Sequence, residues 1–229
     1  MRYGKIQAAR FLRRPNRFVA EVELEGRTEA VHVKNTGRCR ELLVPGARVY
    51  LTPGENPARK TAWDLIAVEK GPLLINMDAQ APNRVFGEWA AAGHFVPGLT
   101  LLRPETTWGR SRFDFYWEAG PERRGFVEVK GVTLEQDGVA AFPDAPTERG
   151  VRHLEELSAA RREGYECAVC FVIQMKGPTR FRPNEAAHPA FGAALRAAAE
   201  AGVDVLAYDC RVTPDQLWLD APVPIDLGG

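Results

Sequence analysis

The hydrophobic and polar residues in the first third of the chain alternate in short segments, which is the pattern of half-buried strands. Such segments cover residues 18–24, 30–33, 48–52 and 63–69, and another begins near Ile6. A basic turn is expected at 13–16, a loop at 35–37 and a short helical turn at 38–43. Five short strands with one helical turn between the third and fourth predict a five-stranded β-barrel of the OB type. A generic SH3-like barrel fits almost as well.

Beyond about residue 82 the pattern changes to a mixture of helices and strands. Helices are expected near 85–92, 147–163 and 184–201, strands at 99–102, 111–119, 123–130, 167–173 and 203–208, and a hairpin over 132–142 turning at Asp137-Gly138. This order predicts an α/β domain with a mixed central sheet. We therefore expect a two-domain α+β/α/β protein, with a barrel over residues 1–78 and the second domain over 79–229.

The stretch SRFDFYWEAGPERRGFVEVK, residues 111–130, is predicted to form two strands joined by a polar turn at 119–122. Because successive side chains on a strand take opposite faces, Phe113, Phe115 and Trp117 are expected to share one face. This arrangement would bury one face of the first strand and leave its other face available for polar residues.

The same alternation places Asp114 on the opposite face, and it places Glu128 and Lys130 together on the second strand. If the strands pair, these three side chains converge. Two carboxylates supply hard oxygen ligands for a divalent cation, and a lysine orients water or stabilises phosphate charge. Plain solvent-facing alternation is the competing interpretation, since 26% of the chain is charged. Glu128 and Lys130 also lie directly before Gly131, at a strand end of the kind that holds sites in α/β sheets.

The overall composition excludes a disordered chain, because 45% of the 229 residues are hydrophobic. Thirty basic residues balance thirty acidic ones, so the net charge indicates no partner. Residues 1–60, however, contain thirteen Lys or Arg and only six Asp or Glu. A basic first quarter indicates a module that binds polyanions, although ordinary fluctuation also explains it. The candidate nucleic-acid-binding residues are Arg13, Arg14, Arg17, Lys34, Arg38 and Arg40.

The sequence also limits the location of the protein. It contains no apolar run near eighteen residues and no signal-peptide core at its start, so a cytoplasmic location with no membrane contact is expected. Cys167-x-x-Cys170 resembles half a zinc site, but residues three apart on a strand face opposite sides. We therefore expect these cysteines, with Cys39 and Cys210, to be core thiols in a reducing compartment.

The order of elements, with Asp114 on one strand and Glu128-x-Lys130 on the next, resembles the PD-(D/E)-x-K nuclease superfamily. The whole chain resembles the sugar fermentation stimulation protein A (SfsA) family through HVKNTGRCRELLVPG, SRFDF, FVEVKGVTL, AFPDAPTERGVRHLEEL and GVDVLAYDC. The resemblance implies an OB-like domain, a restriction-endonuclease-like domain, DNA binding and a link to the regulation of sugar utilisation. It also implies that Asp114 and Glu128 bind metal and that Lys130 is the superfamily's lysine. Phe113 replaces the proline that names the motif.

A second segment of the resemblance lies at the predicted start of the helix near residue 147. Its polar residues are Asp144, Thr147, Glu148, Arg149 and His153. Thr147 and Arg149 are candidate phosphate contacts, because backbone N–H groups at a helix N-terminus favour an anion. Capping of the helix by Asp144 or Thr147 is an equal alternative. Glu88, on the preceding helix, could extend the acidic cluster.

These observations predict a nucleic-acid-binding protein, with DNA as the expected partner. Its site is expected to hydrolyse phosphodiesters with Mg²⁺ or Mn²⁺ held by Asp114 and Glu128 and with Lys130 acting on the attacking water. A DNA-binding regulator that cuts nothing is the main alternative. An oligosaccharide-binding module fits the barrel but leaves the acids and the lysine without a role.

Overall fold

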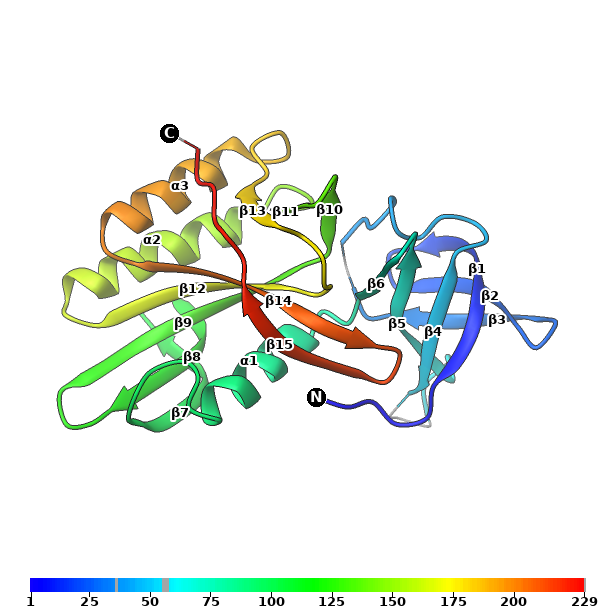
Figure 1. Ribbon diagram of the computed structural model, residues 1–229, viewed down its shortest axis with the longest axis horizontal. Coiled ribbons are helices and arrows are strands. Elements are labelled where there is room, and N and C mark those ends of the chain that lie inside the picture. The colour runs from blue at the N-terminus through cyan, green and yellow to red at the C-terminus, as the bar shows by residue number, and fades with distance from the viewer. Residues whose placement is uncertain (36, 55–57, 229) are drawn as a thin grey trace.

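The computed structural model describes residues 1–35, 37–54 and 58–228, and Thr36 of the expected loop lies outside the described residues. The chain forms two units that lie side by side (Figure 1), a small β-barrel and a larger layered α/β unit. The last strand of the barrel unit ends at Asn76, and the first helix of the second unit begins at Ala81.

The barrel unit contains β1 (Gln7–Asn16), β2 (Val19–Leu24), β3 (Arg27–Val33), β4 (Arg48–Pro53), β5 (Trp63–Lys70) and β6 (Leu73–Asn76). The strand order is β3-β2-β1-β4-β5-β6, and an additional parallel pairing of β3 with β5 closes the sheet through His32 and Asp64. The predicted OB-type barrel of five strands, β1 to β5, is confirmed, and β6 is an additional strand that pairs with β5. Between β3 and β4 the amide of Leu43 donates to the carbonyl of Cys39, which forms the expected helical turn.

The basic turn expected at residues 13–16 is wrong, because β1 continues to Asn16. Pairing with β2 shifts register twice beyond Phe11, and β4 pairs with β1 only as far as Arg10. One edge of β1 is therefore unpaired at Pro15, which is where a strand tolerates proline. The chain turns one residue later, where Asn16 Oδ1 accepts from the amides of Phe18 and Val19 at 2.9 and 3.1 Å.

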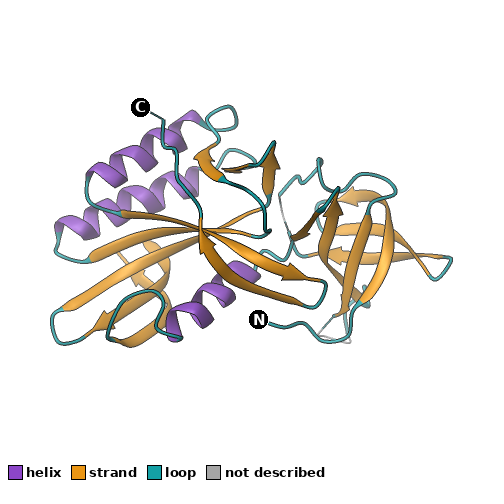
Figure 2. Cartoon of the chain, in the orientation of Figure 1, coloured by secondary structure: helices purple, strands orange, loops and turns teal. Residues whose placement is uncertain are grey.

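The second unit is a mixed six-stranded sheet with helices on both faces (Figure 2). Its strands are β7 (Leu99–Trp108), β8 (Ser111–Ala119), β9 (Arg123–Val132), β12 (Glu166–Ile173), β14 (Asp204–Thr213) and β15 (Gln216–Pro222), in the order β15-β14-β12-β9-β8-β7. β12 pairs in parallel with both β9 and β14, and the remaining pairs are antiparallel. The predicted mixed sheet is confirmed, although β15 was not anticipated from the sequence.

Helices α2 (Glu148–Arg162) and α3 (Pro189–Glu200) cover one face of this sheet, and α1 (Ala81–Ala91) covers the other. The helix expected from residue 184 begins at Pro189, because proline lacks an N–H and favours the first helical turn. A separate small sheet contains β10 (Leu134–Gln136), β11 (Val139–Phe142) and β13 (Arg180–Pro183). The hairpin at Asp137-Gly138 is confirmed, whereas β13 was not anticipated.

One prediction about side-chain direction is wrong. Phe113 packs on the α2 face against Trp108 and Phe126, whereas Phe115 packs on the α1 face against Phe86. The alternation breaks because the ladder between β8 and β9 ends at Phe115 and Val127. In addition, Glu105 of β7 has a left-handed backbone with φ of 53°, between the two residues that pair with Phe115 and Phe113.

The two units share a polar interface. The side-chain amide of Gln174 donates to Asn76 Oδ1 at 2.9 Å and to the carbonyl of Asp78 at 3.0 Å, and all three residues are buried. The first residues of the chain also bind the second unit, since the amides of Tyr3 and Leu217 donate to the carbonyls of Asp215 and Met1. These contacts fix the barrel against the sheet that carries Glu128.

All four cysteines are buried and free. Cys167 packs in the core beneath α2 and α3, and Cys170 packs in the core beneath α1, so they face opposite sides of the sheet as predicted. Burial raises the pKa of Cys39 and Cys167 to about 12, which disfavours the thiolate that zinc requires. Among the described residues, no helix combines the length and apolar character needed to cross a membrane.

Gly125 tests the packing of β9 against β12. A Cβ at this position would collide with the backbone carbonyl oxygen of Glu166 and lie 2.9 Å from the Trp117 ring. We expect Gly125→Ala to lower the free energy of unfolding by at least about 1–3 kcal/mol, the usual effect of overpacking. Gly4 has no atom within 4 Å of the corresponding position, so Gly4→Ala is the matched control. Urea unfolding should leave the control within about 0.5 kcal/mol of wild type. Equal stabilities of the two variants would contradict the pairing register of β9 with β12, in which Gly125 lies opposite Glu166.

Candidate metal and phosphodiester site

Asp114 occupies the point where the β8–β9 ladder ends. Its Oδ2 accepts from the backbone amide of Val129 at 2.8 Å, in place of the next rung of the ladder. Its Oδ1 accepts from the side-chain amide of Asn83, in the first turn of α1, at 2.7 Å. The carboxylate of Asp114 therefore lies beside β9, at the residue between Glu128 and Lys130.

Glu128 is almost fully buried on the α2 face, with 3% of its surface exposed. Its Oε1 accepts from Lys130 Nζ at 2.6 Å and is in direct contact with Nδ1 of His153, which is 2% exposed. Its Oε2 is buried and has no hydrogen-bond partner among the residues that the structure describes. The two oxygens of this carboxylate therefore have different environments.

His153 and Asn83 are the site residues whose contacts the sequence did not predict. His153 lies one turn into α2, and its Nε2 accepts from Arg149 Nε at 3.2 Å. The spacing of Arg149 and His153, four residues apart on a helix, places their side chains next to each other and was an available signal. The sequence contains no comparable signal for Asn83, because its contact with Asp114 depends on how α1 packs against the sheet.

The two acids have opposite electrostatic environments. Burial and the negative charge of Glu128 raise the pKa of Asp114, although hydrogen bonds from Val129 and Asn83 oppose the change. Burial also acts to raise the pKa of Glu128, but the contact with His153 and the charge of Lys130 outweigh it and hold that pKa below its ordinary value. Ionisation of Asp114 thus destabilises the fold as pH rises through its raised pKa. A nearby cation would remove this penalty.

The residues present fit a small divalent cation. An unpaired buried carboxylate oxygen next to a second carboxylate is the hard-oxygen environment that Mg²⁺ and Mn²⁺ prefer. Within the described residues, no three His, Cys, Asp or Glu side chains are grouped closely enough to hold a metal. The protein would therefore supply two side-chain ligands, Asp114 and Glu128, with the Val129 carbonyl as a candidate third ligand.

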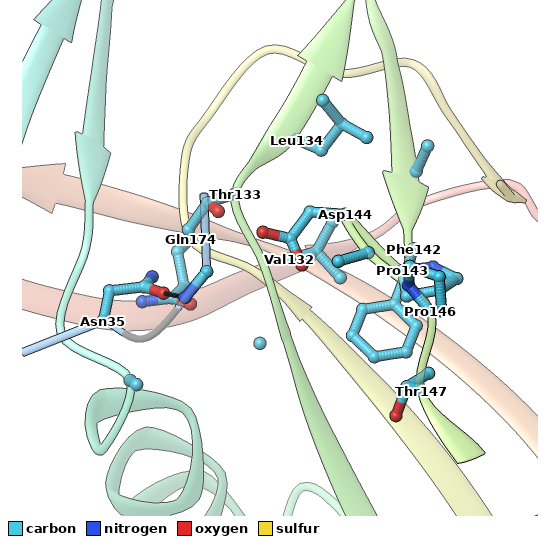
Figure 3. A pocket seen from close by; sticks show the side chains of 15 residues that line it. Asn35, Val132, Thr133, Leu134, Phe142, Pro143, Asp144, Pro146, Thr147 and Gln174 are labelled. Atoms are coloured by element: carbon cyan, nitrogen blue, oxygen red, sulfur yellow. Dashed lines mark hydrogen bonds between the residues drawn. The ribbon is translucent and has the colours of Figure 1, made fainter. Parts of the chain in front are cut away.

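A cleft of about 320 Å³ lies next to the site, between the barrel and the second unit. Gly131, the residue after Lys130, lines it together with Asn35 of the barrel and Asp144 and Thr147 of the loop before α2. Figure 3 shows Asp144 pointing into this space, with Asn35 and Thr147 on opposite sides. The carboxyl end of β9 therefore opens onto a cavity that both units line.

The predicted helix-terminus residues have structural partners. Thr147 caps α2, because its side-chain oxygen accepts from the Gly150 amide at 3.1 Å. This confirms the capping alternative for Thr147. Arg149 is exposed and contacts His153. Glu88 does not extend the acidic cluster, since it binds the terminal amine of Met1 at 2.6 Å and Arg84 at 3.2 Å.

The candidate cations of the barrel fall into two groups. Arg13 is paired with Glu21 at 2.7 Å, and Lys34 is paired with Asp78 at 2.9 Å, so both charges are neutralised within the protein. Arg14 binds four carbonyl oxygens, those of Arg17, Asn35, Gly37 and Arg38, at 2.7–2.8 Å. It therefore fastens the loop after β3 to the end of β1.

The second group of cations lines one groove. Arg17, Arg38 and Arg40 are exposed and surround a depression of about 420 Å³, and none of the described residues that line it is acidic. Phe18 is 44% exposed beside it, with the Arg17 guanidinium 4.6 Å from the centre of its ring. We call these three residues the arginine groove. The arginine groove is therefore positively charged and lies next to the exposed aromatic ring of Phe18.

The fold and the site define a two-domain protein in which an OB barrel precedes a restriction-endonuclease-like α/β domain. Family models agree: the "SfsA N-terminal OB domain" matches residues 12–77, and the "Sugar fermentation stimulation protein RE domain" matches residues 80–216. The chain belongs to the sugar fermentation stimulation protein (SfsA) family.

Relatives described as "Sugar fermentation stimulation protein homolog" resemble the chain over nearly its whole length. One from Desulfitobacterium hafniense (strain Y51) is 57% identical over 217 residues, covering 95% of this chain and 94% of its own. One from Ruminiclostridium cellulolyticum is 50% identical over 227 residues, covering 99% and 100%. The solved structure of Pyrococcus furiosus SfsA in complex with Ca²⁺ has a TM-score of 0.89 at 27% identity and covers 99% of this chain and 98% of its own.

The charge of Glu128 acting on Asp114 gives a direct prediction. Carbon-detected NMR titration of the metal-free protein should show Asp114 ionising above the ordinary aspartate pKa of 3.8. Glu128→Gln should move that pKa downward, because it removes a negative charge that favours the protonated form. Glu118→Gln, on the same strand as Asp114, is the control and should leave the pKa of Asp114 unchanged. An Asp114 titration unaffected by Glu128→Gln would show that the two carboxylates do not interact.

Proposed function

We propose that this protein is a metal-dependent phosphodiesterase that acts on nucleic acid, with DNA as the expected substrate. The observation that carries the proposal is the unpaired Glu128 Oε2, buried within a pair of interacting carboxylates. A buried ionised oxygen without a partner is costly, and a bound divalent cation is the ligand that compensates for it. The free thiols are consistent with a role in the reducing cytoplasm.

The Pyrococcus furiosus relative supports a cation of this class, because its structure is described as a complex with Ca²⁺. Ca²⁺, Mg²⁺ and Mn²⁺ all prefer oxygen ligands, and they differ mainly in ligand number and distance. A site built from carboxylates on rigid strands is suited to a small cation with several water ligands. We therefore propose Mg²⁺ or Mn²⁺ as the working ion of this chain.

In this mechanism Asp114 and Glu128 would hold the cation at the end of β9. A bound divalent cation supplies Lewis-acid stabilisation of the charge that develops on phosphate oxygens and makes a bound water more acidic. Lys130 keeps its ammonium group next to this position, with its side chain 13% exposed, so it can donate to the attacking water or to a phosphate oxygen. The cleft beside Gly131 offers space for the phosphodiester.

The barrel would hold the polymer through the arginine groove. Its three guanidinium groups favour phosphate oxygens, and Phe18 offers a surface on which an unpaired base can stack. Gly37 lines both this groove and the cleft next to β9. A strand bound along the barrel therefore has a path toward the carboxylates.

The alternative is a DNA-binding regulator of sugar utilisation that uses the same groove and cuts nothing. Three observations favour it. Lys130 and His153 already satisfy Glu128 Oε1, and among the described residues no third acid, histidine or cysteine completes a metal cluster. The family is also named for the stimulation of sugar fermentation. The two proposals share DNA binding and differ in whether any phosphodiester is broken.

The arginine groove predicts salt-dependent binding. Changing Arg17, Arg38 and Arg40 together to Gln should weaken binding of a labelled DNA single strand. The plot of log binding constant against log salt concentration should become less steep, with its negative slope reduced in magnitude by about 2. The same change at Arg10, Arg27 and Arg48 removes equal charge from the barrel outside this groove. Fluorescence anisotropy should show a smaller effect for this control. Equal losses from both variants would make the effect one of net charge alone.

Cleavage separates the enzyme from the regulator. Purified wild type should cut labelled DNA with Mn²⁺ or Mg²⁺ and not with chelator. Lys130→Ala should lower the rate by about 10²–10⁴, the typical contribution of a positioned acid–base group, while metal still binds. Asp114→Asn should abolish cutting and leave DNA binding intact, because it removes a ligand and one negative charge.

Two exposed residues provide matched controls for these changes. Lys60→Ala and Asp137→Asn repeat the two substitutions away from the site and should cut like wild type. Wild type that leaves every substrate intact with either metal would support the regulator. Asp114→Asn protein that cuts as fast as wild type would assign the activity to a contaminant.

A further inference from the structure

We propose that His153 is the positioning residue of the metal site, and that Arg149 and Glu128 together fix the tautomer in which it acts. The inference rests on the proposed function, because it concerns the same carboxylate. His153 would not touch the metal or the substrate. It would act through Glu128, by holding Oε1 so that Oε2 remains available as the ligand.

The hydrogen-bond partners of the imidazole determine its tautomer. Arginine carries only donors, so His153 Nε2, which lies 3.2 Å from Arg149 Nε, must be the acceptor of that bond. A neutral imidazole then carries its proton on Nδ1, which contacts Glu128 Oε1. Arg149 and Glu128 therefore require the same form of the ring. The candidate phosphate contact Arg149 thus has a second role, as the partner that orients His153.

The ring has little freedom to leave this orientation. His153 is 2% exposed, and Phe113 meets it edge to face with 6.2 Å between ring centres. The helix that carries His153 is capped by Thr147 and anchored in the core by Leu154. The break in alternation at Phe113 contributes directly here, because it places that ring on the α2 face, next to His153.

The consequence for Glu128 follows from its two oxygens. Oε1 is in contact with both Lys130 and His153, whereas Oε2 has no partner among the described residues. Without His153, Lys130 alone would hold the carboxylate, and its flexible ammonium group can follow either oxygen. His153 is thus the rigid contact that distinguishes the two oxygens. Hydrogen-bonding partners of a ligating carboxylate typically change metal affinity about 10–100-fold.

Two substitutions separate this role from general packing. The side-chain nitrogen of Asn occupies about the position of Nδ1, and that of Gln about the position of Nε2. His153→Asn therefore keeps a donor for Glu128, whereas His153→Gln keeps a group near Arg149 and loses that donor. Calorimetric titration of Mn²⁺ into the full chain should give a Kd near wild type for His153→Asn. The Kd of His153→Gln should be about 10–100-fold weaker.

The wild-type protein provides a second, metal-free measurement. Nitrogen-15 NMR of labelled histidine, with His153→Asn used for assignment, should show His153 protonated at Nδ1 and not at Nε2. Arg149→Met removes the donor to Nε2 and leaves Glu128 as the acceptor at Nδ1, so the Nδ1 proton should remain while the Nε2 resonance shifts with the loss of its hydrogen bond. Circular dichroism should show that the variants remain folded.

The possible outcomes are distinct. Protonation of His153 at Nε2 in wild type would overturn the inference whatever the variants do. Equal Mn²⁺ affinities of His153→Asn and His153→Gln would also overturn it while leaving the metal site intact. Wild type that binds no Mn²⁺ would contradict the proposed function itself and the role of His153 with it. If wild type binds Mn²⁺ but does not cut DNA, the proposed nuclease activity is contradicted, and the positioning role of His153 at the metal site still stands.

Discussion

The unequal environment of the two Glu128 oxygens is the constraint on which this site depends. Oε1 is held by Lys130 and His153, and Oε2 is buried without a partner in the described chain. Burial of an unpaired charged oxygen opposes folding, so such an atom persists where a ligand compensates or where function requires it. The lowered pKa of Glu128 keeps this oxygen ionised. The structure thus keeps a buried, ionised oxygen at the position where we propose a cation.

Several elements distant in sequence build this environment. β9 supplies Glu128 and Lys130, β8 supplies Asp114 at the end of its ladder, and α2 supplies His153. Parallel pairing of β9 with β12 brings their carboxyl ends to one edge of the sheet. At that edge the barrel loop closes the other side of the cleft. The cleft beside the carboxylates therefore exists only when both units are folded and joined.

Sequence periodicity predicts most of this fold, since the alternation in the barrel and the order of elements after it depend on local burial. Glu128 and Lys130 follow from the same rule, because they lie two residues apart on one strand. The rule fails at Phe113, where the β8–β9 ladder ends, and periodicity assumes an unbroken ladder. It also cannot show that Asp78 neutralises Lys34 or that Asn83 binds Asp114, since both contacts depend on tertiary packing.

The central claim is that Asp114 and Glu128 together hold a divalent cation through Glu128 Oε2, the buried oxygen that has no partner among the described residues. A crystal of the full chain soaked in Mn²⁺ tests it most directly, because manganese gives an anomalous signal that locates the ion. We predict one peak at the end of β9, with Glu128 Oε2 and an Asp114 oxygen at about 2.0–2.6 Å, the range for hard cations. A peak bound elsewhere, or a site that stays empty of manganese with Oε2 still unpaired, would contradict the account.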